Sequence, residues 1–231
     1  MLKSLAVRVN PRAAVITLLY STLTLSLLCS IGLQRSKADG VLPPSAEQVE
    51  PLKVGDAAPA FAVRTVADEP WEFDPARLER PTVIITFRGG WCPYCNMHLS
   101  ELRTVMPELE ALGIDVIFLS GDRPELLYSS LQTDTREDID GLGYRIFSDA
   151  DAKAAVALGI AFRAAEQTIR RRHEKGQDIS DSSMERHGIL PVPSVFVIGA
   201  DGRIRYTFIE ADYKIRLSAA DLLAAAKESV N

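Results

Sequence analysis

Residues 81–102 read PTVIITFRGGWCPYCNMHLSEL, and the fold is predicted outward from this stretch. Its first part, Pro81–Phe87, is a continuous apolar run rich in β-branched residues, which is typical of a strand buried on both faces. Cys92 and Cys95 follow, and a helical pattern begins at Pro93, because proline suits the first turn of a helix, where no N–H partner is needed. The cysteine pair is therefore expected where a buried strand meets a helix N-terminus.

The rest of the chain alternates between strand and helix patterns. The helix from Pro93 is expected to reach Leu112, with a kink or break at Pro107. Hairpins are expected around 61–70 and at the Asp201-Gly202 turn, and further strands at 114–122 and 144–149. Three more helices are expected: one at 124–131, one that begins after a cap at Asp149 or Asp151, and one that begins after a cap at Ser218. This order predicts an α/β fold with a mixed central β-sheet flanked by helices.

The first 38 residues have a different composition from the rest. They contain basic residues and no acid, and the 21 residues from Ala13 to Leu33 carry no charge. Such a segment can span a bilayer as a hydrophobic helix, and Ser36 and Ala38 also satisfy the small-residue rule for signal cleavage. We predict a signal peptide or membrane anchor at 1–38, a linker at 39–52 and the folded domain at 53–231. More positive charge lies before the apolar segment than after it, which predicts that the folded domain is extracytoplasmic. The domain would then be periplasmic or anchored in the membrane through residues 13–33.

Charge limits the classes of partner. The net charge is −5, so nothing in the composition suggests nucleic acid. The region 163–187 carries an unbroken run of charged residues from Arg170 to Lys175. The favoured interpretation is a solvated helix and loop, with a docking surface as the minority interpretation.

The position of the two cysteines predicts redox chemistry. Free N–H groups at a helix N-terminus favour a thiolate at Cys92, and only the thiolate attacks. Cys95, one turn further into the helix, faces the same side and can resolve a mixed disulfide formed by Cys92. We expect an exposed attacker and a protected resolver, with Trp91 shielding the pair. A structural disulfide is the weaker alternative, because so small a loop contributes little chain entropy.

A metal site is the alternative from another class. Cys92, Cys95 and His98 would supply three ligands, where a closed zinc site needs four. Copper delivery by the two cysteines and a histidine is the specific form of this alternative, although His187 lies several residues from the position where such a histidine would be expected. His98 is favoured as a helix-surface residue, and no metal is assigned.

Two short motifs resemble the thioredoxin superfamily. The segment WCPYC, from Trp91 to Cys95, is similar to its W-C-x-x-C motif, and its Cys-Pro-Tyr-Cys core to the glutaredoxin active site. The segment VPS, from Val192 to Ser194, resembles the one whose cis-proline faces the cysteines in that fold. The resemblance implies a thioredoxin-like fold, with Pro193 as the candidate cis-proline and Pro93 in support of the pair.

The wider match resembles the alkyl hydroperoxide reductase/thiol-specific antioxidant family, the peroxiredoxins, in a branch with a C-x-x-C. The segments VGDAAPAF, FRGGWCPYC, FSDADAKAAVALGI and PSVFVIGADGRIRYTFIEADYKIR carry it across residues 52–228. It implies an antioxidant oxidoreductase of cell redox homeostasis that needs no organic cofactor. It also implies a disulfide or peroxide substrate and a thioredoxin- or glutaredoxin-like partner as reductant.

Departures from the family bear on the substrate. Gly89 stands where a peroxiredoxin has Thr or Ser, and the arginine that steers peroxide falls at Pro193, so Arg88 is the candidate substitute. Thr86 replaces the buried acid of thioredoxins. The resemblance therefore supports dithiol chemistry more strongly than peroxide reduction.

Overall fold

The computed structural model describes residues 41–229, and the chain divides into a unit at Met1–Asp39 and a unit at Gly40–Asn231. The predicted signal peptide or anchor, with its hydrophobic helix, lies outside the described residues. Among residues 41–229, no helix combines the length and the apolar character needed to cross a membrane. All of the described residues belong to the second unit.

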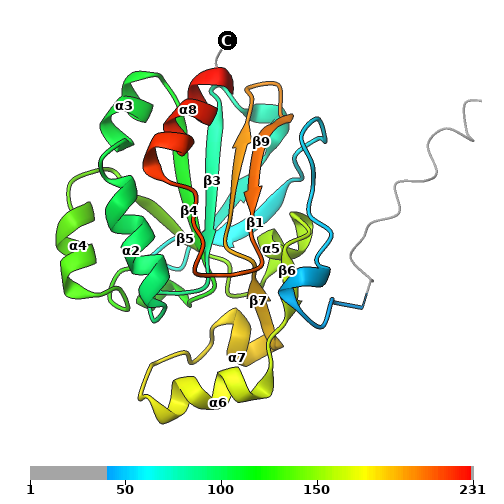
Figure 1. Cartoon of the computed structure of the whole chain (residues 1–231), viewed down its shortest axis with the longest axis vertical. Coiled ribbons are helices and arrows are strands. Elements are labelled where there is room, and N and C mark those ends of the chain that lie inside the picture. The colour runs from blue at the N-terminus through cyan, green and yellow to red at the C-terminus, as the bar shows by residue number, and fades with distance from the viewer. Residues whose placement is uncertain (1–40, 230–231) are drawn as a thin grey trace, which may run out of the picture. The chain divides into compact units, whose positions relative to one another are not determined.

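A seven-stranded mixed sheet forms the centre of the domain, in the order β2-β1-β5-β4-β3-β8-β9 (Figure 1). The central strands β3, β4 and β5 are parallel, while β8 runs antiparallel to β3 and β1 antiparallel to β5. The strand bounds are β1 Phe61–Arg64, β2 Pro70–Phe73, β3 Thr82–Phe87, β4 Asp115–Ser120, β5 Arg145–Ser148, β8 Ser194–Ile198 and β9 Ile204–Ile209. The predicted mixed sheet and both predicted hairpins are confirmed.

Helices cover both faces of the sheet (Figure 1). One face packs against α2 (Pro93–Leu102), α3 (Met106–Ala111) and α8 (Ala219–Ser229), and the other against α5 (Lys153–Ala157). Strand β3 supplies both cores: Val83 and Ile85 join the first, and Ile84 between them joins the second. The uninterrupted apolar run that predicted β3 is therefore explained by burial on both faces.

Several helical details match the sequence. The predicted long helix is broken between α2 and α3, with Pro107 in the first turn of α3. The carboxylate of Asp149 caps α5, accepting hydrogen bonds from the backbone N–H groups of Ala154 and Ala155, both at 2.9 Å. The helix α4 (Thr133–Ile139) was not predicted, because its sequence, TDTREDI, is almost entirely polar.

Smaller elements lie beside the sheet. A two-stranded sheet, β6 (Ala161–Arg163) with β7 (Ile189–Pro191), leads to α6 (Glu166–Glu174) and α7 (Ser183–His187) at the lower end of the view (Figure 1). Single-turn 3-10 helices are η2 Ala46–Gln48, η3 Pro75–Arg77 and η4 Pro124–Leu126. The described part of the predicted linker packs on the domain: Arg163 N–H donates to the Pro43 carbonyl at 2.8 Å, and Leu52 N–H to the Leu158 carbonyl at 3.2 Å.

Candidate active site

The cysteine pair lies where the sequence predicts it. Strand β3 ends at Phe87, and Cys92 is the N-cap residue of α2, whose first residue is Pro93. Both cysteines are free thiols. The expectation of an exposed attacker is wrong, because Cys92 and Cys95 are each only 1% exposed. They differ in access, since Cys92 lines a cavity of about 390 Å³ that Cys95 does not reach.

The two thiols have opposite acidities. The hydrogen bond from Cys95 lowers the pKa of Cys92 to about 6, although burial opposes this. The positive charges of Arg88 and Arg216 act in the same direction as that hydrogen bond. Burial raises the pKa of Cys95 well above its ordinary value, and its hydrogen bond to Cys92 adds to the effect. At neutral pH the pair therefore holds one thiolate, at Cys92, and one thiol, at Cys95.

Two arginines flank the pair, of which the sequence indicated one. Arg88, half-buried, lies with its guanidinium carbon 5.4 Å from the centre of the Trp91 ring and 4.6 Å from that of Tyr213. Arg216 was missed, yet its Nη2 lies 3.7 Å from the Cys95 sulfur. Cys95 and Arg216 are 121 residues apart in sequence, so no local pattern connects them.

A buried polar clamp holds the loop before Cys92. The Gly90 N–H donates to Asp122 Oδ2 at 2.7 Å, and the Gly90 carbonyl accepts from Asn96 Nδ2 at 2.7 Å. Asn96 Oδ1 in turn accepts from the Gln132 N–H at 2.8 Å. Burial raises the pKa of Asp122 to about 6. No sequence pattern indicates this clamp, because its members belong to different elements.

The missing hydroxyl at Gly89 has a structural reason. Gly89 has φ +146°, a conformation that side chains rarely adopt. A Cβ there would lie 2.4 Å from Trp91 Nε1 and 2.6 Å from Asp122 Oδ1. These two buried atoms have no hydrogen-bond partner within the described part of the chain. The loop therefore has no room for the Thr or Ser that a peroxiredoxin carries at this position.

Pro193 lies between β7 and β8, in the segment that the sequence indicated, but its expected cis bond is wrong. The described residues contain no cis peptide bond. Thr86 holds the trans segment on both sides of the proline: its hydroxyl donates to the Val192 carbonyl at 3.1 Å and accepts from the Ser194 N–H at 2.9 Å. Thr86, which stands at the position of the thioredoxin acid, therefore has a structural role: it links β3 to the segment around Pro193.

The histidines do not join the cysteines. His98 is buried rather than on the helix surface, and its Nε2 lies 3.0 Å from the Leu217 carbonyl. A carbonyl only accepts, so Nε2 carries the proton, and burial lowers the pKa of His98 to about 4. His187 pairs instead with Asp151, at 3.9 Å. Within residues 41–229, no three His, Cys, Asp or Glu side chains are grouped to hold a metal ion.

The charged run from Arg170 to Lys175 is exposed, as the favoured interpretation of a solvated helix predicts, except for Arg172, which is half-buried beside the cysteine site. The guanidinium carbon of Arg172, on α6, lies 4.8 Å from the centre of the Trp91 ring. Gln177 accepts from Arg172 Nη1 at 3.0 Å and donates to the Trp91 carbonyl at 3.1 Å. Trp91 itself is 8% exposed, so the segment encloses the residue that precedes Cys92.

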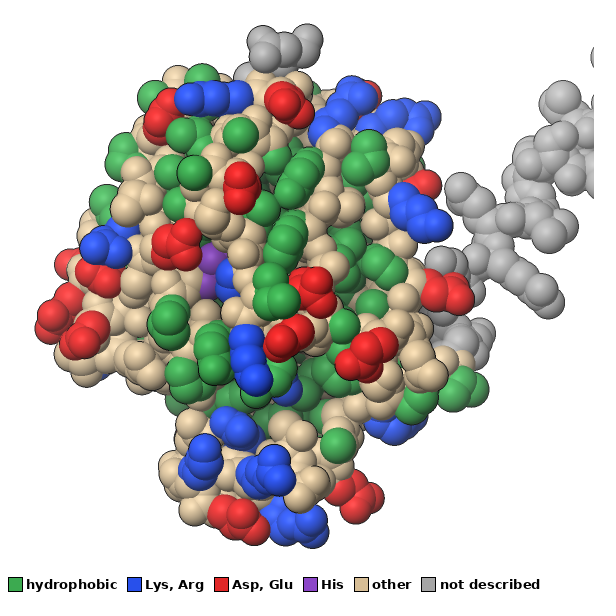
Figure 2. All heavy atoms as spheres, in the orientation of Figure 1, with side chains coloured by type: hydrophobic (Ala, Val, Ile, Leu, Met, Phe, Trp, Pro, Cys, Tyr) green, Lys and Arg blue, Asp and Glu red, His purple; other side chains and the backbone are tan. Residues whose placement is uncertain are grey.

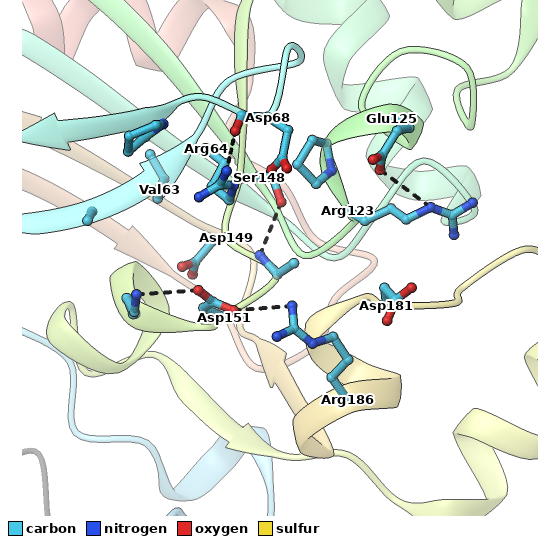
Figure 3. Close-up of a pocket in the computed structure, with 15 residues that line it drawn as sticks. Val63, Arg64, Asp68, Arg123, Glu125, Ser148, Asp149, Asp151, Asp181 and Arg186 are labelled. Carbon is cyan, nitrogen blue, oxygen red and sulfur yellow. Dashed lines mark hydrogen bonds and ion pairs between the residues drawn. The ribbon is translucent and has the colours of Figure 1, made fainter.

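A second cavity, of about 410 Å³, lies away from the cysteines (Figure 3). None of its lining residues belongs to the cysteine loop. Figure 3 shows ion pairs among its charged side chains: Arg64 with Asp68, Arg123 with Glu125 at 3.6 Å, and Arg186 with Asp151 at 3.2 Å. This cavity contains no cysteine, so the candidate redox site is the separate cavity that Cys92 lines.

The acidity of Cys92 makes a measurable prediction. Alkylation of the reduced protein by iodoacetamide should rise with pH around a midpoint near 6 at Cys92, while Cys95 stays unreacted through neutral pH. Peptide mass spectrometry resolves the two sites. In Cys95→Ala the midpoint should move upward, because the side-chain donor to the Cys92 thiolate is lost. A wild-type midpoint near that of an ordinary thiol, about 8.5, would contradict the assignment.

Comparisons with known proteins find related sequences and a shared fold. Residues 54–207 match the AhpC/TSA family. Peroxiredoxin Bcp of Escherichia coli (strain K12) is 27% identical over 112 residues, which cover 48% of this chain and 67% of Bcp. Thiol-disulfide oxidoreductase ResA of Bacillus thuringiensis is 21% identical over 155 residues, which cover 67% of this chain and 69% of ResA. A peroxiredoxin-like protein from Aquifex aeolicus has the same fold, with a TM-score of 0.52 and 22% identity over 78% of this chain and 88% of that one.

Proposed function

The chain belongs to the AhpC/TSA family, and we propose that within this family of thiol-dependent oxidoreductases it reduces disulfides through Cys92 and Cys95. The observation that carries the proposal is the placement of two adjacent free thiols: Cys92 is the N-cap of α2 and lines a cavity, and Cys95 does not line it. The hydrogen bond from Cys95 lowers the pKa of Cys92, and burial raises the pKa of Cys95. Two-step thiol–disulfide exchange requires one thiolate that attacks the substrate first and a neighbouring thiol that attacks the mixed disulfide second.

The steps follow from these protonation states. The Cys92 thiolate attacks one sulfur of a disulfide, the substrate S–S bond breaks, and the first thiolate leaves and takes a proton from solvent. Cys95 then gives up its proton and attacks the Cys92 sulfur, and the second thiolate leaves with that proton. The substrate gains two electrons, and the protein holds a Cys92–Cys95 disulfide. A thioredoxin- or glutaredoxin-like dithiol partner reverses the oxidation.

Disulfide reduction is favoured over peroxide reduction by the loop geometry. Peroxide cleavage needs donors that polarise the O–O bond in the transition state. The hydroxyl donor of peroxiredoxins is absent at Gly89, and the space that it would need is occupied. Arg88 and Arg216 remain as cations near the pair, and their charges stabilise a thiolate whichever substrate it attacks.

Trapping the adduct at Cys92 separates the two substrates. In Cys95→Ser the first step proceeds and the second cannot, so the adduct accumulates. We expect a stoichiometric mixed disulfide with a protein disulfide such as insulin, and much slower formation of sulfenic acid with hydrogen peroxide. Intact mass and a dimedone probe measure the two products. Rapid sulfenic acid formation without a mixed disulfide would reverse the proposal in favour of a peroxidase.

A further inference from the structure

The cavity that leads to Cys92 is lined by cations. Arg88, Arg171, Arg172 and Lys175 line it, and no aspartate or glutamate is among its described lining residues. The last three come from α6 and the residue that follows it. Figure 2 shows Lys and Arg side chains gathered over this lower end of the molecule. The surroundings of Cys92 are therefore positive although the chain as a whole is negative, at −5.

The four cations that line this cavity differ from the paired Lys and Arg side chains of the described residues. Nine other Lys and Arg side chains lie within 4.0 Å of a carboxylate. Within the described residues, none of the four cations that line the cavity has such a partner. The Nε atoms of Arg88 and Arg172 are also buried without an acceptor. A buried donor without an acceptor raises the free energy of the folded state, and a ligand with anionic oxygens would accept hydrogen bonds from these donors.

The arrangement is held in place before any ligand arrives. One indole ring, that of Trp91, contacts the guanidinium groups of both Arg88 and Arg172, at 5.4 and 4.8 Å. Gln177 ties Arg172 to the Trp91 backbone. Cation–π contacts offset part of the repulsion between two like charges. Preorganised cations bind an anion without a second entropy cost for their ordering.

The size and shape of the cavity indicate a small ligand. A volume of about 390 Å³ is within the range of small-molecule sites, roughly 300–1,000 Å³. An adjoining cavity of about 270 Å³ shares Arg88, Thr168 and Tyr213 with it and continues to Pro193. A ligand can therefore place charged groups against the cations and extend toward Pro193 while its sulfurs stay near Cys92.

We propose that this cavity binds a low-molecular-weight disulfide that carries carboxylate groups, and that Arg88, Arg172 and their neighbours hold the carboxylates while Cys92 attacks the S–S bond. The inference rests on the proposed disulfide reductase function and specifies its substrate class. One turnover converts the disulfide into two carboxylate-bearing thiols and leaves the Cys92–Cys95 disulfide. The two cysteines supply the two electrons that the substrate gains. Cys95 supplies one of the two protons and solvent supplies the other, because Cys92 reacts as a thiolate.

A charge series of small disulfides tests the proposal. The probes are 3,3′-dithiodipropionate with two carboxylates, bis(2-hydroxyethyl) disulfide without charge, and cystamine with two ammonium groups. Stopped-flow Trp fluorescence follows oxidation of the reduced full-length protein, and each rate is divided by the rate of dithiothreitol with the same probe to remove intrinsic reactivity. We expect the dianion to react about tenfold faster than the neutral probe, and this preference to shrink as salt rises.

Matched variants on one helix locate the effect. Arg172→Gln should lower the ratio of the dianion rate to the neutral-probe rate by about tenfold, which corresponds to one charge-assisted contact. Arg170→Gln removes the same charge from an exposed position on α6 outside the cavity and should leave both rates unchanged. The Cys92 alkylation profile of Arg172→Gln shows whether the attacking thiolate itself is altered.

The outcomes separate this inference from the function on which it rests. If the protein reduces neither small probes nor insulin, the disulfide reductase function is wrong. If it reduces all three probes at equal normalised rates, the function stands and the anionic substrate class is overturned. If Arg170→Gln and Arg172→Gln slow the dianion equally, general attraction rather than the cavity is responsible, and the proposed site is overturned. If Arg172→Gln slows only a protein disulfide, the cations recognise an acidic protein, and the small-ligand proposal is likewise overturned.

Discussion

Cys92→Ser should abolish turnover with every disulfide substrate, lowering kcat/KM by at least about 10³-fold. The serine hydroxyl is not ionised at neutral pH, whereas Cys92 has a pKa of about 6 and is a thiolate there. Cys95 cannot take over the attack, because burial keeps its pKa raised and it does not line the cavity. Coupled reduction of insulin by a thiol reductant measures the loss.

Cys95→Ser is the matched control for this loss. It should also stop turnover, yet it keeps the first chemical step and yields one equivalent of mixed disulfide, which Cys92→Ser cannot form. The two serine variants therefore share a steady-state result and differ in a single-turnover experiment. If Cys92→Ser forms the adduct and Cys95→Ser does not, the roles of the two cysteines are reversed. If Cys92→Ser keeps turnover within tenfold of wild type, neither assignment holds.

The sequence was sufficient for the parts of the site that depend on neighbouring residues. A buried strand, a short loop and a helix that begins at Pro93 follow from local apolar pattern and proline geometry, and together they place Cys92 as the N-cap of α2. The alternation of Val83 and Ile85 with Ile84 between the two cores follows from the same run. The split of the long helix near Pro107 is equally local.

The parts that could not be predicted depend on contacts between distant segments. Arg216 reaches Cys95 across 121 positions, and Asp122 reaches Gly90 across 32. Neither residue lies in a pattern that distinguishes it from a surface charge. Arg172 is one of several consecutive charges, and only tertiary packing selects it to lie on Trp91. The predicted surface position of His98 is wrong for the same reason. A single polar residue in a helical pattern does not reveal that a distant backbone carbonyl, here that of Leu217, will be its hydrogen-bond partner.

Asp122→Asn should stabilise the protein at alkaline pH and leave its stability at acid pH nearly unchanged. Burial raises the pKa of Asp122 from 3.8 to about 6, so the folded protein keeps a proton that the unfolded chain has released between these values. The stabilisation of the protonated form is complete below about pH 4 and is lost as the pH rises through about 6, by roughly 2–3 kcal/mol. Asparagine cannot ionise and keeps an oxygen to accept from the Gly90 N–H, so it escapes this loss.

Urea unfolding of wild type and Asp122→Asn from pH 4 to pH 8, under reducing conditions, measures the difference in the free energy of unfolding. Two other groups also make the stability depend on pH: burial raises the pKa of Asp149 to about 7, and the hydrogen bond from Cys95 lowers that of Cys92 to about 6. Both groups are present in wild type and variant, so their contributions cancel in the difference. Asp134→Asn, on the exposed side of α4, controls for the loss of one negative charge. A difference that stays constant across the range would mean that Asp122 titrates alike in the folded and unfolded chains, and the buried clamp at Gly90 would then not hold a protonated carboxyl between about pH 4 and 6.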